Sequence, residues 1–225
     1  MPRYRGKLGV SADVIGDILA SMLARYPALR AAEDDIMSAF AYLEESFRRG
    51  GKLLVCGNGG SAADAEHRVG ELMKGFVRRR PVSADLARRM TELFGATGAR
   101  LAGKLQGALP AIALAAHVGL TTAFNNDVDP SATFAQQVHG YGRKGDSLLA
   151  ISTSGNAPNV IGAAMVARAQ GLAAIGLSGE TGGALAGICD VCIRVPSGVT
   201  YEIQEYHLPV YHCLCMMLEE AFFTT

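Results

Sequence analysis

Short apolar runs alternate with amphipathic stretches over most of the chain. The apolar runs predict five strands, at residues 52–56, 110–115, 147–151, 172–177 and 190–195. Apolar positions at helical spacing predict helices between and after them, at residues 60–75, 132–140, 156–170, 181–187 and 200–222. Near-continuous apolar strands separated by helices are typical of a parallel sheet that is covered on both faces. The pattern therefore predicts an α/β fold.

Two segments lie outside this alternation. Residues 11–49 predict two helices, so we expect a helical N-terminal extension of about residues 1–50. Residues 77–109 begin with the basic run Arg78, Arg79 and Arg80 and then predict one or two short helices. A solvated surface face is the usual explanation for such a run, and contact with a phosphate is the alternative. We expect one domain, residues 1–225, that carries 77–109 as an atypical insertion.

Composition narrows the possible partners. The chain has 225 residues, 49% of them hydrophobic, which suits one sizeable domain. Its formal net charge is zero, which argues against a general nucleic-acid or membrane surface. No stretch reaches the roughly 18 apolar residues of a membrane span, and no signal-peptide pattern opens the chain, so we expect a cytoplasmic protein.

The five cysteines indicate reduced thiols. They are an odd number in a chain without a secretion signal: Cys56, Cys189, Cys192, Cys213 and Cys215. The pair Cys189 and Cys192 has the spacing of a redox or zinc motif. However, it lies in the apparent strand ICDVCIRV, and there is no second such pair. We therefore expect these thiols to be packed in the core.

The densest candidate chemistry follows the first predicted strand. Residues 57–61 form a glycine-rich turn that opens a helix, and backbone N–H groups at such a turn can bind an anion. His67 and Glu71 are four residues apart on that helix and so share one face. A phosphate cradle and an acid–base or metal-binding pair are thus expected on adjacent turns. This arrangement indicates an enzyme that acts on a small phosphorylated substrate.

A second turn repeats this design after the third strand. Hydroxyl and amide side chains crowd around Gly155, namely Ser152, Thr153, Ser154 and Asn156. One such turn would suit a simple helix cap, but two at equivalent strand ends favour a ligand. Neither turn ends in the Gly-Lys-Ser/Thr of nucleotide hydrolases. The first matches GxGxxA, yet its expected acidic partner is replaced by arginines, so NADP binding is the weaker alternative and we expect no nucleotide cofactor.

The last predicted helix carries four polar groups in a segment otherwise built for burial. They are Gln204, Glu205, His207 and His212. A lone histidine on such a helix is usually a packed core residue. Two histidines, an amide and a carboxylate within nine residues instead indicate a functional site.

Together these segments resemble the SIS (sugar isomerase) domain family, and within it the branch that acts on heptose 7-phosphates. The resemblance covers about residues 30–222 and rests on CGNGGSAADAEH with the following Glu71, NND at 125–127, ISTSGN and IQEYHLPVYH. It implies a flavodoxin-like three-layer fold with a five-stranded parallel sheet flanked by helices. It also implies a homotetramer with active sites between subunits, and conversion of sedoheptulose 7-phosphate to D-glycero-D-manno-heptose 7-phosphate for heptose, glycan and lipopolysaccharide biosynthesis.

The resemblance also implies residue roles. Glu71 would be the base and His212 the acid of an enediol proton transfer. Residues at matching positions would bind the sugar phosphate: Asn58, Gly59, Ser61, Asp127, Ser152, Thr153, Ser154 and Gln204. Zinc would be held by His67, Glu71, Gln204 and His212.

Physical reasoning and sequence departures qualify these roles. Gln204 and His212 are eight residues apart, about 12 Å on an ideal helix, so one ion can meet both only if Pro209 distorts the helix or two subunits contribute. Ala157 replaces a serine common in the family, Glu202 replaces an arginine, and residues 77–109 are longer than usual. The main alternative is a non-catalytic SIS protein, either a sugar-phosphate-binding regulator or a tetrameric adaptor. The acid–base pair favours the enzyme.

Overall fold

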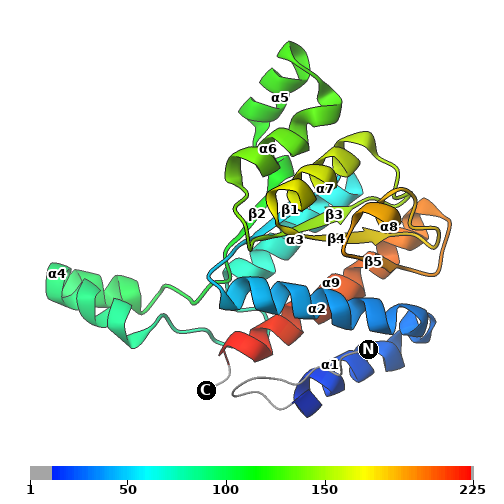
Figure 1. The fold of residues 1–225 in the computed structure, drawn as a ribbon. Coiled ribbons are helices and arrows are strands. Elements are labelled where there is room, and N and C mark those ends of the chain that lie inside the picture. The colour runs from blue at the N-terminus through cyan, green and yellow to red at the C-terminus, as the bar shows by residue number, and fades with distance from the viewer. Residues whose placement is uncertain (1–11, 224–225) are drawn as a thin grey trace.

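The computed structural model describes residues 12–223, which contain a five-stranded parallel sheet (Figure 1). The strands are β1 (Leu53–Cys56), β2 (Ala111–Ala113), β3 (Ser147–Ile151), β4 (Ala173–Ser178) and β5 (Val191–Arg194). Their order across the sheet is β2-β1-β3-β4-β5. Each predicted strand is observed within two residues of its predicted ends. The predicted fold class is confirmed.

Helices cover both faces of the sheet and make three layers (Figure 1). One face is covered by α2 (Glu33–Arg48), α3 (Gly60–Met73) and α9 (Thr200–Phe223). The other is covered by α6 (Thr133–Tyr141), α7 (Pro158–Gln170) and α8 (Leu185–Ile188). Successive strand residues point to opposite faces, so Leu53 and Val55 join the first core while Leu54 and Cys56 join the second.

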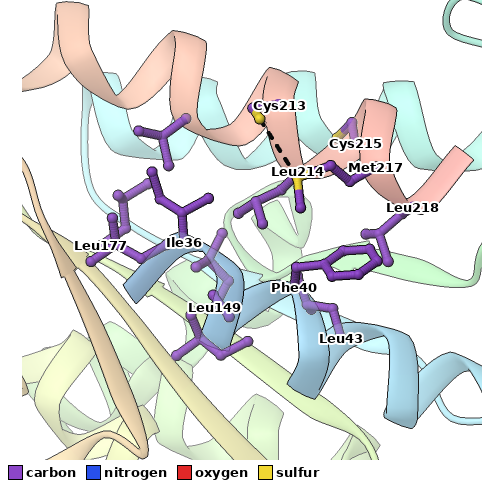
Figure 2. Packing of buried hydrophobic residues seen from close by; sticks show 14 of the residues in the cluster. Ile36, Phe40, Leu43, Leu149, Leu177, Cys213, Leu214, Cys215, Met217 and Leu218 are labelled. Atoms are coloured by element: carbon purple, nitrogen blue, oxygen red, sulfur yellow. Dashed lines mark hydrogen bonds between the residues drawn. The ribbon is translucent and has the colours of Figure 1, made fainter. Parts of the chain in front are cut away.

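The first core holds α9 firmly against the sheet (Figure 2). Phe40 of α2 and Leu149 of β3 lie in one buried cluster with Leu214, Met217 and Leu218 of α9. Burying each such side chain contributes about 1.5–3 kcal/mol relative to leaving it exposed. The rotation of α9 about its own axis is therefore set by its apolar face, and the polar residues on its remaining surface are placed accordingly.

The strand order reverses between β1 and β3. From β1 the chain continues to β2 on one side, whereas from β3 it continues to β4 on the other. In open parallel sheets the crevice beyond the carboxyl ends of two such strands is the usual ligand site. Both predicted phosphate turns, residues 57–61 and 152–156, begin at these two strand ends.

The remaining helices lie outside the three layers or at their edges. They are α1 (Ala12–Arg25), α4 (Ala84–Ala102) and α5 (Val118–Asp127), together with the short 3-10 segments Pro27–Ala32, Leu114–Ala116 and Pro130–Ala132. α1 packs against α9, while α4 and α5 project from the body of the molecule (Figure 1). Among residues 12–223, no helix is long and apolar enough to cross a membrane.

Three local predictions are corrected. Helix α5 was not predicted, because its segment buries no residue and so lacks an apolar periodicity. Helix α8 begins at Leu185 rather than at residue 181, since Gly182 and Gly183 both have positive φ. A solvated face fits Arg78 and Arg79, which are exposed, but is the wrong explanation for Arg80, which is buried against Glu219; Arg78 also pairs with Glu220.

The cysteines behave as packed thiols. All five are free; four are buried, and Cys189 is half-buried. Burial raises the pKa of Cys189 to about 12 and that of Cys215 to about 11, so both are protonated at neutral pH. Cys189 follows the end of α8 and does not lie in β5 as expected, but core packing of the thiols is confirmed.

A buried histidine on α9 predicts acid sensitivity. Burial lowers the pKa of His207 to about 4, from an ordinary 6.5, and the backbone of Ser178 offsets only part of that shift. The unfolded chain therefore binds a proton between these values that the folded chain does not. We expect the free energy of unfolding to fall by up to about 3 kcal/mol as the pH falls from about 7 to about 4.

Urea unfolding of the wild type, His207→Gln and the exposed control His139→Gln at both pH values measures this loss. The His207→Gln variant should lose less stability on acidification than the other two proteins. An equal loss in all three would assign the acid sensitivity to other groups.

Candidate functional site

The first phosphate turn is shaped by close backbone packing. Gly59 has φ +55°, which favours glycine, and α3 begins at the next residue. A Cβ on Gly57 would lie 2.7 Å from the Ser61 carbonyl oxygen, so this position also requires glycine. No side chain caps α3, and Ser61 is buried in its first turn. The positive end of the helix dipole is thus available to an anion.

The second phosphate turn is braced from behind. Ser152 is buried, and its N–H donates to the Leu177 carbonyl oxygen of β4. The Asn156 amide donates to the Ser154 carbonyl oxygen at 3.0 Å and accepts from the Ala184 N–H at 2.9 Å. The Asn156 side chain therefore supports the turn, and its amide is engaged by backbone groups. Ala157 precedes α7 without a side-chain cap, which leaves the first turn of α7 open.

A pair of amides joins the two turns. Asn58 Nδ2 donates to Asn159 Oδ1 at 2.9 Å, and Asn159 Nδ2 donates to Asn58 Oδ1 at the same distance. This reciprocal pair confirms that the two strand ends bring their turns together. Sequence reasoning missed Asn159, although its place in the first turn of α7 was a usable signal.

Gln204 lies over the first turn. A Cβ on Gly60 would lie 2.5 Å from Gln204 Nε2, so glycine there admits the amide. The start of α9 thus covers the start of α3. Nearby, Glu202 accepts a hydrogen bond from the Ser197 hydroxyl at 2.7 Å and so orders the approach to α9.

The acid–base candidates lie together on α3 and α9. His67 Nε2 is 3.6 Å from Glu71 Oε1, and the ring centroids of His67 and His212 are 5.0 Å apart. Lys74 Nζ lies 3.0 Å from Glu71 Oε2. Two residues far apart in the chain, Glu71 and His212, therefore share one site with His67.

Tyr211 and Asp64 orient His67. The Tyr211 hydroxyl donates to Asp64 Oδ1 at 3.3 Å and lies 3.0 Å from His67 Nδ1. Since that hydroxyl has one proton, which it donates to Asp64, His67 Nδ1 is the donor in its contact with the hydroxyl oxygen. Burial raises the pKa of Tyr211, with Asp64 adding to the rise, so the hydroxyl stays a donor. Neither residue was predicted from sequence.

His212 is a neutral imidazole in a partly apolar setting. Burial, followed by the nearby His67, lowers the pKa of His212, and Glu71 opposes the shift. Its Nε2 is buried and has no hydrogen-bond partner within residues 12–223. A cavity of about 190 Å³ opens beside it, lined also by Phe76 and Pro209.

The four predicted zinc ligands do not converge within the chain. Gln204 lies at Gly60, whereas His212 lies two turns further along α9, which runs unbroken through Pro209. Among the described residues, no three His, Cys, Asp or Glu side chains are arranged to hold a metal ion. The four-ligand set therefore does not fit zinc within a single chain.

The predicted residues fall into separate groups. His67 and Glu71 lie seven and eleven residues after Gly60, about 10 Å and 16 Å, or two and three turns, along α3, so the expectation of adjacent turns is wrong. Asp127 ends α5, where its carboxylate accepts from Asn126 Nδ2 at 2.9 Å. The chain thus holds two phosphate-type turns and, separately, an acid–base cluster.

One sizeable cavity belongs to neither group. It has a volume of about 940 Å³ and lies between α4 and residues 75–82. None of the predicted site residues lines it. We attribute this space to the projection of α4 from the body of the molecule.

Comparisons with known proteins agree on one family. Residues 19–179 match the SIS domain model. The chain is 40% identical over 186 residues to the phosphoheptose isomerase of Rhodospirillum rubrum, and the aligned region covers 83% of this chain and 85% of that protein. It is 38% identical over 210 residues to that of Roseiflexus sp., covering 93% of each. The structure of the phosphoheptose isomerase from Neisseria gonorrhoeae superimposes with a TM-score of 0.70 at 30% identity, covering 92% of this chain and 97% of that one.

The second turn predicts a sharp effect of one methyl group. Gly155 has φ +67°, and a Cβ there would lie 2.0 Å from the Gly182 carbonyl oxygen. We expect Gly155→Ala to destabilise the fold by about 1–3 kcal/mol, because backbone strain adds to the collision. We expect it to weaken binding of inorganic phosphate by roughly tenfold or more, or about 1.4 kcal/mol.

Gly162→Ala is the matched control. Gly162 lies within α7, where a Cβ would meet ordinary contacts at 3.6 Å. The free energy of unfolding of this variant should therefore rise by about 0.5–1 kcal/mol. Calorimetry with phosphate and urea unfolding measure both effects. If Gly155→Ala bound phosphate as tightly as the wild type, this turn would not be part of the anion site.

Proposed function

The chain belongs to the SIS domain family, and from this membership we propose that it interconverts sedoheptulose 7-phosphate and D-glycero-D-manno-heptose 7-phosphate. Its relatives at 38% and 40% identity are phosphoheptose isomerases, matched over most of their length. The observation that carries the proposal is the meeting of His67, Glu71 and His212 on α3 and α9. A protein that only bound sugar phosphates would need the two turns but not this cluster.

The reaction moves one hydrogen between neighbouring carbons. Glu71 would remove a proton from C1 of the ketose while His212 donates a proton to the C2 carbonyl oxygen, giving a 1,2-enediol. Return of the proton from Glu71 to C2, with removal of the O1 proton by His212, gives the aldose. One carbon of the sugar is oxidised as its neighbour is reduced, so the reaction needs no external oxidant. A neutral imidazole suits the second role, since it has both a donor and an acceptor nitrogen.

The phosphate would be anchored by the two turns. Ser61, Ser152, Thr153 and Ser154 offer hydroxyls beside the open helix ends of α3 and α7. This anchor leaves the sugar chain to extend away from the crevice. Asn58, Gly59, Gln204 and Asp127 would then contact the substrate, as the family resemblance implies.

We propose that the working enzyme is a homotetramer whose active sites lie between subunits. The separation of about 10 Å from Gly60 to His67 and about 16 Å to Glu71 along α3 supports this, because one chain does not place its phosphate turns beside its acid–base cluster. A second subunit would bring its own phosphate turns toward Glu71 and His212. We also propose a cytoplasmic enzyme that supplies heptose for glycan synthesis.

Zinc binding stays a prediction from the resemblance. His67 Nε2, a Glu71 oxygen and His212 Nε2 are chemically suitable donors, but they do not converge with Gln204 in one chain. We therefore expect zinc to copurify with the tetramer and to be absent from monomer separated by size. Elemental analysis of the two fractions tests this, with Cys189→Ser as a variant that should retain the metal. Zinc in the monomer, or in neither fraction, would contradict the prediction.

Turnover of sedoheptulose 7-phosphate tests the function. In deuterated solvent we expect deuterium to enter C2 of the aldose product, because the transferred proton exchanges on the base. Glu71→Gln should lower kcat by about 100-fold or more while inorganic phosphate binds as in the wild type. Chromatography and mass spectrometry of the product, with phosphate calorimetry, measure these results.

Glu66→Gln is the control for that substitution. It makes the same chemical change on an exposed side chain of the same helix and should leave turnover intact. Full activity of Glu71→Gln would remove Glu71 from the role of base. Phosphate binding by the wild type with no turnover would instead identify a sugar-phosphate-binding regulator.

A further inference from the structure

Arg80 and Glu219 form an ion pair that is wholly removed from solvent. Both side chains have 0% exposure, and Arg80 Nε lies 2.7 Å from Glu219 Oε1. Burying two charges is costly, and replacing such a pair by apolar groups is often neutral or stabilising. The pair therefore calls for an explanation beyond fold stability.

Arg80 holds the end of α3. Its Nη1 donates to the Leu72 carbonyl oxygen at 2.8 Å, and its Nη2 donates to the Glu71 carbonyl oxygen at 3.1 Å. The last carbonyls of a helix have no partner within the helix, so this guanidinium supplies one. One of the two carbonyls belongs to the proposed base itself.

Glu219 holds the chain that follows α3. Its Oε1 accepts from the Phe76 N–H at 2.9 Å, and its Oε2 accepts from the Val77 and Arg78 N–H groups at 2.9 and 3.2 Å. Glu219 lies two turns after His212 on α9. The Phe76 ring, whose own N–H is held here, packs on the His212 ring with centroids 5.2 Å apart.

Phe223, near the end of α9, and Gly107, which follows α4, cover the pair. The Phe223 ring covers the Arg80 guanidinium at 4.6 Å. The Gly107 N–H donates to the Arg80 carbonyl oxygen at 2.6 Å, and a Cβ on Gly107 would lie 2.7 Å from the Phe223 ring. The low-dielectric setting strengthens each directional hydrogen bond and so stiffens the connection.

We propose that Arg80 and Glu219 are positioning residues for the isomerase reaction, which fix Glu71 of α3 relative to His212 of α9. The inference rests on the proposed function. Proton transfer depends steeply on the separation and angle of acid and base, and a shift of about 1 Å can cost about 100-fold in rate. Neither residue contacts the phosphate turns, so substrate anchoring should not depend on them.

Arg80→Lys and Glu219→Gln test the proposal. Lysine keeps the charge but cannot reach two helix carbonyls and a carboxylate together; glutamine keeps the shape but loses the charge. We expect each variant to lower kcat for sedoheptulose 7-phosphate by about 10- to 100-fold, with KM changed by less than about threefold. Binding of inorganic phosphate should match the wild type. Circular dichroism and size measurements check that the variants fold and assemble.

Arg78→Lys is the matched control. Arg78 lies two residues earlier and forms an ion pair with Glu220, but its side chain is 49% exposed. This variant should keep kcat within about twofold of the wild type, because exposed pairs contribute little.

Four results would overturn the proposal. They are an unchanged kcat in both variants, a loss expressed only in KM, an equal loss in the control, and failure of both variants to fold, which would show a purely structural role. Absence of sedoheptulose 7-phosphate isomerisation by the wild type would instead contradict the proposed function. The positioning proposal is contradicted only by the behaviour of the variants.

Discussion

The burial of α9 between the sheet, α2 and α3 is the constraint on which the rest of the structure depends. Its apolar side chains, among them Leu214 and Leu218, fill the larger core and leave no freedom of rotation. The other faces of the helix must then present Gln204 to the first phosphate turn and His212 to His67. A hydrophobic interaction without directional preference of its own thus places groups whose chemistry is strongly directional.

Polar contacts refine what this packing begins. Glu219 and Arg80 tie α9 to the end of α3, while Tyr211 ties it to His67 in the middle of that helix. At the opposite end, close approach at Gly60 lets Gln204 reach the start of α3. The helix is therefore joined to α3 at three levels. Each contact has a different chemistry and a different consequence for the proposed reaction.

Within one chain the phosphate turns and the acid–base cluster lie apart, and this separation is the basis of the proposed assembly. The sheet reversal brings the turns after β1 and β3 together at the carboxyl ends of these strands, where ligands of open parallel sheets usually bind. The acid–base residues His67 and Glu71 lie about two and three turns further along α3. A geometry that separates binding from chemistry in the monomer is consistent with sites completed by a second copy. It also accounts for the failure of the four predicted zinc ligands to converge.

The sequence by itself determined the strands, most helices and the class of ligand, because apolar periodicity and glycine turns are local properties. Its resemblance to a known family also predicted roles for Glu71 and His212, two residues that the structure brings close to His67. Only the tertiary structure decided that Arg80 is buried, that Asn156 accepts a hydrogen bond from the Ala184 N–H, and that Asn159 is hydrogen-bonded to Asn58. These outcomes depend on contacts between segments far apart in the chain, and the direction of a side chain across such a contact is set by packing that no local pattern records.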